Sequence, residues 1–471
     1  MNGFLHSDFL LDTEYARILY HKYAKHIPMP YIHSNISPSD ISKNKAFSNI
    51  TELWICSDEQ RQRGMRACGC EEKYITGEAS DYDKFREYCR IMPELIGSAM
   101  YCFSHLELRR YFDCDLVICP QNCERIWNVT AQKLSYGGMN VRTLLERSDV
   151  KMLLLDVDPC DSLSDFERIS ESDCSVTVKP TFSPCRGLCV EHRGIRKYIE
   201  RLSERSGVMI AGLADLERAY MALLDRFESL GCCTASHSAS ILTELRLPDP
   251  YHADLVLKKA LASDGSDITP EEAGLFRCQM MRFFGIEYKK RGIVMQLYLD
   301  RKEEGKADQL PRLGEGSLIG ISDFKSRVNR LASLLNYLCQ EKALPKTLVS
   351  AGDPSEISEL SRLCADLRRG DLTLMIDWQT DSGFDGLKIC LGEYASASAL
   401  GKLCGMIANP ERVFMNSEYE CFRRVLCSFV GEICERGLCP WDEDTLGELI
   451  CNILYRNETD LLGGSIGSIR T

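Results

Sequence analysis

Short apolar runs alternate with longer amphipathic stretches over most of the chain. The runs are rich in β-branched and aliphatic residues, and each has the length of a strand. The stretches between them repeat apolar residues at spacings of three and four, which is typical of helices that bury one face. The pattern predicts strands at residues 30–36, 150–157, 176–181, 231–235, 292–299, 346–351, 372–378 and 403–408.

Helical patterns separate the later predicted strands. They cover residues 194–206, 213–230, 271–291, 323–341 and 355–368. Alternating strands and helices build parallel βαβ units, and eight such strands predict an α/β fold, a (β/α)₈ barrel of the TIM type.

The link between the first two strands is too long for one crossover. Residues 37–149 carry several helical patterns, so we expect a helical insertion subdomain that lies over the mouth of the barrel. Residues 1–36 would then hold an N-terminal segment and the first strand. Residues 150–462 would hold the rest of the barrel, with a smaller helical insertion near 238–291, and residues 463–471 a flexible tail.

Charge and composition exclude several classes of partner. The 471 residues include 57 Lys and Arg against 69 Asp and Glu, a net charge of −12. Nucleic acids and anionic membranes are bound through clustered basic residues, so we expect neither as a partner. No apolar run is long enough to span a membrane, and the first residues do not resemble a secretion signal, so we expect a cytoplasmic protein.

Cysteine is unusually frequent, with 24 residues. No C-x-x-C pair occurs, which argues against a structural zinc site. Most of the cysteines lie within apolar runs, where a free thiol behaves as a small hydrophobic side chain. We therefore expect them to be reduced and mostly buried.

Barrel enzymes carry their chemistry at the carboxyl ends of the strands. The first predicted strand ends with His33 and Asn35, which share a face because they are two residues apart. A second histidine there would indicate a metal site, but an amide oxygen is a weak ligand for the metals that imidazole favours. His237, after the fourth strand, is a second isolated imidazole that could be structural or functional.

Acidic residues also follow several strands. We interpret them as helix caps and solvated groups rather than as one site, because they are scattered over separate strands. They are Asp156, Asp158, Asp300, Asp353, Asp377 and Asp381.

Motifs along nearly the whole chain resemble one known family. They include FLxxDFLL at 4–11, NITELW at 49–54, YITGxASD at 74–81, HLELRRYF at 105–112, DPxD at 158–161, RGxVMQL at 291–297, ALPKT at 343–347 and FRRxLC at 422–427. The sequence is similar to the uronate isomerases, barrel enzymes of the amidohydrolase superfamily that interconvert aldo- and ketohexuronates. The resemblance implies a hexuronate ligand.

The resemblance places the family's metal ligands at His33, Asn35 and Asn409. The family has H-x-H at the first two of these and an aspartate at the third, so two of the three positions are substituted here. A family site would hold a divalent metal such as zinc, but with one imidazole left we expect no cofactor in this chain.

The resemblance also implies substrate-binding and catalytic positions. Ser183 and Glu411 stand where the family has arginines, and Trp378 remains from a tryptophan pair. The candidates left for catalysis are Asp381, Tyr298 and His237.

Three functions remain open from the sequence. The one we favour is a paralogue with impaired or no catalysis, a pseudoenzyme that keeps the barrel and binds a sugar acid. The alternative is an active uronate isomerase of hexuronate catabolism with an altered site. A third is an enzyme that uses the aspartates with Mg²⁺. Whether the chain forms a homo-oligomer is left open.

Overall fold

Eight parallel strands form the centre of the computed structural model. It describes residues 4–34, 36–135, 138–239, 249–299, 324–367, 372–378, 383–407, 414 and 416–463, with the backbone alone at 31–33 and 324–327. The strands pair in the order of the chain. They are β1 (Met29–Ser34), β2 (Val150–Val157), β3 (Thr177–Phe182), β4 (Thr234–Ser238), β5 (Val294–Tyr298), β6 (Thr347–Ala351), β7 (Leu372–Asp377) and β8 (Met406–Ile407).

Every neighbouring pair of strands is parallel, so the predicted TIM-type α/β fold is confirmed. The pairing runs from β1 to β8, and within the described residues no ladder joins β8 back to β1. Each strand lies within a few residues of its predicted position. The largest difference is β8, which has two residues where we expected six.

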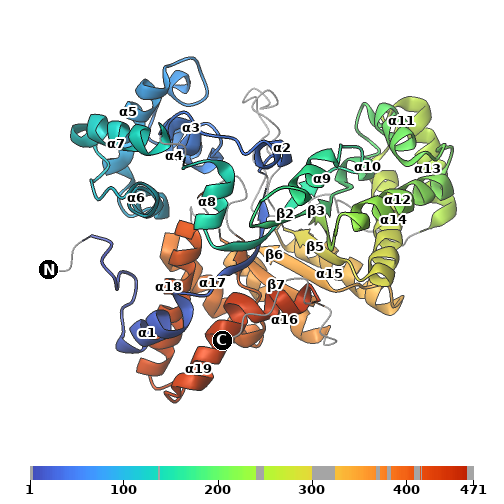
Figure 1. The fold of residues 1–471 in the computed structure, drawn as a ribbon. Coiled ribbons are helices and arrows are strands. Elements are labelled where there is room, and N and C mark those ends of the chain that lie inside the picture. Colours follow the sequence, from blue (N-terminus) through green and yellow to red (C-terminus); the bar gives the residue numbers. More distant parts are fainter. Residues whose placement is uncertain are drawn as a thin grey trace.

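Helices follow the strands along the chain (Figure 1). They are α9 (Ser164–Ser170), α10 (Cys185–Leu188), α11 (Ile195–Ser206), α12 (Leu213–Ser229), α13 (Pro250–Ser263), α14 (Pro270–Arg291), α15 (Phe324–Gln340), α16 (Pro354–Asp366), α17 (Gly383–Ala397), η9 (Leu400–Lys402), α18 (Asn416–Glu435) and α19 (Glu443–Cys451). Of these, α9 and α12 pack on β3, α14 on β5 and α16 on β7. None of the described helices is both long and apolar enough to cross a membrane.

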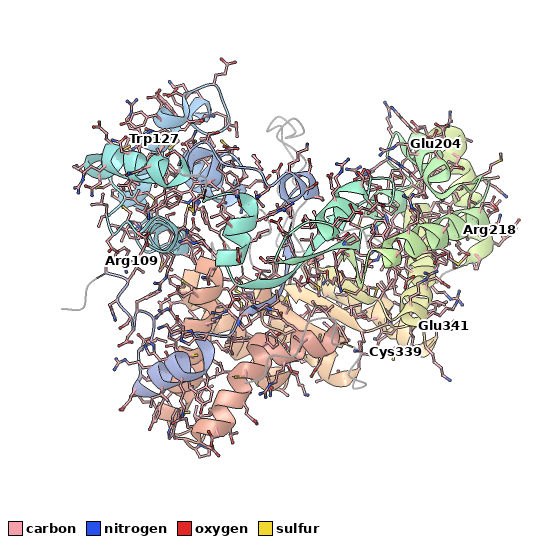
Figure 2. The ribbon with its side chains drawn as sticks, in the orientation of Figure 1. Arg109, Trp127, Glu204, Arg218, Cys339 and Glu341 are labelled. Atoms are coloured by element: carbon pink, nitrogen blue, oxygen red, sulfur yellow. The ribbon has the colours of Figure 1, made fainter. Side chains whose placement is uncertain are left out.

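The chain between β1 and β2 is helical throughout its regular elements, as expected. These are α2 (Pro38–Ser42), α3 (Ile50–Trp54), α4 (Glu59–Ala67), η2 (Glu72–Tyr74), α5 (Asp81–Ile91), η3 (Met92–Leu95), α6 (Ala99–Phe112), η4 (Pro120–Asn122), α7 (Cys123–Ser135) and α8 (Val141–Arg147). In Figure 1, α3 to α7 form a group beside the sheet, away from α11 and α13. Within this group the ring of Trp127 on α7 lies 5.7 Å from that of Phe85 on α5 (Figure 2).

A buried ion pair within the inserted helices is hydrogen-bonded to the barrel helix α18. The Arg61 guanidinium on α4 lies 2.6 Å from the Glu107 carboxylate on α6, and both side chains are almost fully buried. The Ser417 hydroxyl on α18 donates a hydrogen bond of 3.1 Å to the same carboxylate. Because a buried charge without a partner is costly, this network fixes α4, α6 and α18 relative to one another.

Alternate residues of the strands pack into two separate apolar clusters. One joins Met152, Leu154, Val294, Leu348, Met375 and Ile407 across five strands. The residues between them, such as Leu153, Met295 and Val349, belong to the larger cluster that includes the helices. Side chains alternate between the faces of a strand, so the first set faces the interior of the curved sheet.

The last helices close the amino-terminal end of this interior. They are η10 (Asn452–Arg456) and α20 (Asn457–Leu461), and with α1 (Glu14–Ile18) and η1 (Leu19–Ala24) at the start of the chain they complete the described elements. Tyr455, Leu461 and Leu462 join the inner cluster. The Asn457 amide donates hydrogen bonds of 2.8 Å to the Gly401 and Leu403 carbonyls, just before β8.

Candidate active site

The inward-facing side chains change from apolar to polar toward the carboxyl ends of the strands. Five of these residues lie two or four positions after an inner apolar residue of the same strand. The sixth, Ser236, pairs in register with one of the five, Gln296. They are Asp156 on β2, Ser236 on β4, Gln296 and Tyr298 on β5, Ser350 on β6 and Asp377 on β7. We call this set the inner polar layer.

Hydrogen bonds organise part of the inner polar layer. The Ser236 hydroxyl donates to the Asp156 carboxylate at 2.6 Å, which joins β2 to β4 across β3. The Tyr298 hydroxyl donates to the Gln296 side-chain oxygen at 2.8 Å. Asp156 is exposed, whereas Asp377 is only 4% exposed. Hydroxyl, amide and carboxylate groups therefore meet at this end of the barrel, where a sugar could exchange hydrogen bonds with them.

Ser350 differs from its neighbours because its buried hydroxyl has no hydrogen-bond partner among the residues that the structure describes. It is 1% exposed and pairs in register with Tyr298 on one side and Met375 on the other. A buried hydroxyl without a partner costs free energy, so this position is suited to a hydrogen bond from a ligand or a water molecule.

His237 does not face the barrel interior. Its imidazole Nε2 lies 3.0 Å from the Tyr288 hydroxyl on α14, and its ring packs against Phe284 on the same helix. Burial lowers the pKa of His237 to about 3, so the ring is neutral at physiological pH. His237 therefore lies on the outer face of β4, against α14 and away from the inner polar layer.

Trp378 also turns outward, directly after β7. Its indole N–H donates to the Gly383 carbonyl at 3.1 Å, and its ring meets the edge of Phe103 on α6 at 5.4 Å. The side chain is 5% exposed, so it joins the inserted helices to the sheet. Ser183 follows β3 and is half-buried, and its amide donates to the Val157 carbonyl at 3.0 Å.

The remaining predicted residues have little or no described structure. The backbone of His33 pairs in register with that of Leu154, whose side chain faces the interior. Asn35, Asp381, Asn409 and Glu411 lie outside the described residues. Of the predicted catalytic residues that the structure describes, Tyr298 belongs to the inner polar layer and His237 does not.

Sequence reasoning overlooked most of the inner polar layer. Serine and glutamine within apolar runs were treated as parts of strands, and Asp156 and Asp377 as caps or solvated groups. The available signal was their spacing of two from inner apolar residues, such as Leu348 before Ser350.

The described residues do not by themselves make up a metal site. Among them, no group of three or more His, Cys, Asp and Glu side chains converges closely enough to hold an ion. The donors that the inner polar layer offers are oxygen atoms of Asp156 and Asp377, which suit hard cations better than zinc.

Comparisons with known proteins agree along the whole chain. The family model described as glucuronate isomerase matches residues 1–462. A uronate isomerase from Endomicrobium trichonymphae is 32% identical over 97% of this chain and 98% of its own length. One from Caldanaerobacter subterraneus is 32% identical over 98% of this chain and all of its own. The crystal structure of a Thermotoga maritima uronate isomerase superposes with a TM-score of 0.87, at 26% identity, over 98% of this chain and all of that one.

These matches correct the expectation that no cofactor is needed. Uronate isomerases, the family matched over residues 1–462, use a divalent metal. The expectation was wrong because it rested only on the residue types at three aligned positions, His33, Asn35 and Asn409, whereas the family matched over residues 1–462 uses a divalent metal. With a family model that covers 462 residues and relatives of 32% identity over their full length, the chain belongs to the uronate isomerase family.

Proposed function

We propose that this protein binds a hexuronate at the carboxyl end of its barrel and isomerises it weakly or not at all. The inner polar layer is the observation that carries the proposal. Its hydroxyl, amide and carboxylate groups can exchange hydrogen bonds with sugar hydroxyls, as Ser236 and Asp156 do with each other. None of the six side chains is a histidine, lysine or arginine.

We expect weak catalysis because this chain lacks basic and cationic side chains at positions where the family has them. Aldose–ketose isomerisation moves a proton between two carbons and needs a general base beside the sugar. His237 is turned away and neutral. Glu411 stands where the family has an arginine, and two like charges about 4 Å apart repel by about 4 kcal/mol at an effective dielectric constant near 20.

A divalent metal, when bound, would polarise the sugar oxygens and stabilise negative charge on them. Of the family's ligand positions, this chain keeps the imidazole of His33 and has amides at Asn35 and Asn409. No step of the proposal depends on the ion. The residues of the chain itself bind and orient the sugar through the inner polar layer.

An active isomerase is the second candidate. It is favoured by 29–32% identity to proteins named uronate isomerase over nearly their whole length. Tyr298 and Asp381 would then be the groups that move the proton. D-glucuronate and D-galacturonate would be the substrates, and D-fructuronate and D-tagaturonate the products.

Measuring both turnover and binding of uronates distinguishes the weak or inactive protein from the active isomerase. The purified protein, with and without added Zn²⁺ or Mn²⁺, is assayed on both uronates beside an intact uronate isomerase, and binding is measured by calorimetry. We expect binding of at least one uronate and a kcat/KM at least a thousandfold below the reference enzyme, roughly the loss of 4 kcal/mol of transition-state stabilisation. A kcat/KM within tenfold of the reference, reduced in His33→Ala, would establish the active isomerase instead.

Restoring the family residues tests the reason for the loss. Asn35→His with Asn409→Asp should raise metal affinity. Activity should also require Glu411→Arg and Ser183→Arg, which remove the repulsion and grip the sugar carboxylate. Activity in the two-residue variant equal to that of the four-residue variant would show that the charge at these two positions is not the obstacle.

We also propose a cytoplasmic location. All 24 cysteines are free in the structure, which is typical of proteins from a reducing compartment. Fractionation of the native cells with an antibody against the protein tests this.

A further inference from the structure

Two cysteines meet where α18 ends, far from the inner polar layer. Cys434 lies in the last turn of α18, and Cys439 lies in the segment that leads to α19. Their Sγ atoms are 3.1 Å apart. A disulfide bond is about 2.05 Å long, so the two sulfurs need to move together by only about 1 Å to form one.

A tight turn holds the two thiols in this position. Gly437 has a φ of +71°, which a glycine adopts without strain, and its amide donates to the Cys434 carbonyl at 2.9 Å. The Leu438 amide donates to the Ile433 carbonyl at 3.0 Å. This is the usual way in which glycine ends a helix and turns the chain back. The turn is complete without a disulfide, so the pair is positioned in the reduced protein.

One thiol of the pair, that of Cys439, is also partly accessible from solvent. Cys439 is half-buried and follows Leu438, which is 64% exposed. Cys89 and Cys123 are also neighbours, but they are 0% and 3% exposed. Burial raises the pKa of Cys434, and this residue is only 7% exposed, so a peroxide reaches the more exposed Cys439 first.

We propose that Cys434 and Cys439 are a redox-sensitive pair that forms an intrachain disulfide on exposure to a hydroperoxide. The Cys439 thiolate attacks one peroxide oxygen, the O–O bond breaks, and hydroxide leaves, which makes a sulfenic acid. The Cys434 sulfur then attacks the sulfenic sulfur, and its proton leaves with the hydroxyl group as water. In total two thiols and one H₂O₂ give one disulfide and two H₂O. Two molecules of a cellular thiol such as glutathione reduce the disulfide by exchange and leave as their own disulfide.

The disulfide would restrict the movement of the segment that leads from α18 to Trp441. The ring of Trp441 lies 4.7 Å from that of Tyr15 on α1, so this segment holds the amino-terminal helix against the barrel. Gly431, one turn before Cys434 on α18, leaves room for this packing, because a Cβ atom there would lie 2.5 Å from the Thr13 hydroxyl and 2.7 Å from the Ala16 amide. The oxidation therefore acts at the contact between α1 and α18.

Peptide mapping of the full-length protein tests the proposal. The reduced protein is treated with H₂O₂, the remaining thiols are alkylated, and the chain is cut with trypsin, which cleaves after Arg436 between the two cysteines. We expect the Cys434 and Cys439 peptides to stay joined without reductant and to separate with it. Two of the 24 thiols should be lost from the count in the denatured protein.

Two single variants make the result specific. Cys439→Ser should abolish the joined peptides and leave Cys434 as a thiol. Cys339→Ser is the matched control, because Cys339 is half-buried at the end of α15 (Figure 2) and should leave the linkage intact. Sulfinic acid on Cys439 without joined peptides would overturn the proposal, as would joined peptides in the Cys439→Ser variant or linkage of Cys89 to Cys123 at the same dose.

Discussion

The two ends of the barrel fill their interiors with different kinds of side chain. At the amino-terminal end, Tyr455, Leu461 and Leu462 close the interior against apolar strand residues such as Leu348. At the carboxyl end, the inner polar layer replaces them, beginning with Ser350 only two residues further along the same strand. One end is built to exclude water, and the other keeps groups that can bind a polar molecule.

Residues at the amino-terminal end stabilise the fold, whereas residues of the inner polar layer are available to bind a ligand. An apolar residue at the closed end is stabilising without any partner outside the chain. A buried hydroxyl at the carboxyl end is not, because it loses water without gaining a hydrogen bond. Substitutions at matched positions of the two ends should therefore change stability in opposite directions.

The largest effect is expected at the closed end. Leu348→Ala removes a side chain that is 2% exposed within the inner cluster and leaves a cavity. We expect a loss of about 3 kcal/mol in the free energy of unfolding, measured by chemical denaturation. A loss below about 1 kcal/mol would mean that the interior is not tightly packed at this end.

Glu458 is the exception to the apolar character of the closed end. It lies on α20 against Gly405, where a Cβ atom would be within contact of its carboxyl group, and its Oε1 has no hydrogen-bond partner. Burial raises the pKa of Glu458 well above its ordinary 4.5. The folded chain therefore keeps this proton at pH values where the unfolded chain has lost it, and the stability of the native sequence should fall as the pH rises above 4.5.

Glu458→Gln should remove this pH dependence. We expect the variant and the native sequence to be similar near pH 4 and the variant to be more stable by about 2 kcal/mol at pH 8. Unfolding curves at both pH values, with the exposed Glu435→Gln as a control for the chemical change, measure this. A variant that is less stable at pH 8 would mean that the ionised carboxylate has a favourable partner.

Substitution of His237 tests whether this residue near the carboxyl end of the barrel contributes to ligand binding or to the stability of the fold. Because its folded pKa of about 3 lies below its ordinary 6.5, protonation favours the unfolded chain, and stability should fall as the pH drops from 6.5 toward 3. The slope due to one group is at most about 1.4 kcal/mol per pH unit. His237→Phe should remove that slope without changing ligand binding at pH 7, whereas the exposed His192→Phe should keep it. Loss of ligand binding in His237→Phe would show that His237 contributes to the binding site.

Ser350→Ala should give the smallest change in stability and the clearest change in binding. Its hydroxyl has no partner, so we expect a gain of up to about 1 kcal/mol in the free energy of unfolding. Any ligand that hydrogen-bonds to this hydroxyl should bind more weakly, by roughly tenfold for one hydrogen bond. Calorimetry with a uronate measures the change, and equal affinity would remove Ser350 from the proposed site.

The sequence was sufficient for the architecture because the strand signal is local. The run of residues 152–155 is apolar throughout, and every residue of β6 is buried, as expected for strands covered on both faces of a parallel sheet. β8 was too short to be bounded from the same signal, since the apolar run continues beyond its two paired residues.

The local sequence does not predict which face of the sheet a strand residue occupies. His237 and Ser236 are neighbours in the sequence, yet one bonds to Tyr288 on α14 and the other to Asp156 inside the barrel. Trp378 turns toward Phe103, which is far from it in the chain. Such contacts depend on register and on the packing of distant helices, so a motif at a strand end could not assign these side chains to the site.

The inserted helices have a consequence for the order in which the barrel assembles on the ribosome. β1 emerges early, but its neighbour β2 begins only at Val150, and the last helix to pack against the barrel's closed end finishes at Leu461. At about 10 residues per second, β1 waits on the order of ten seconds for its first partner. During this delay its backbone donors and acceptors are unpaired, so the nascent chain is most exposed to aggregation before β2 is made.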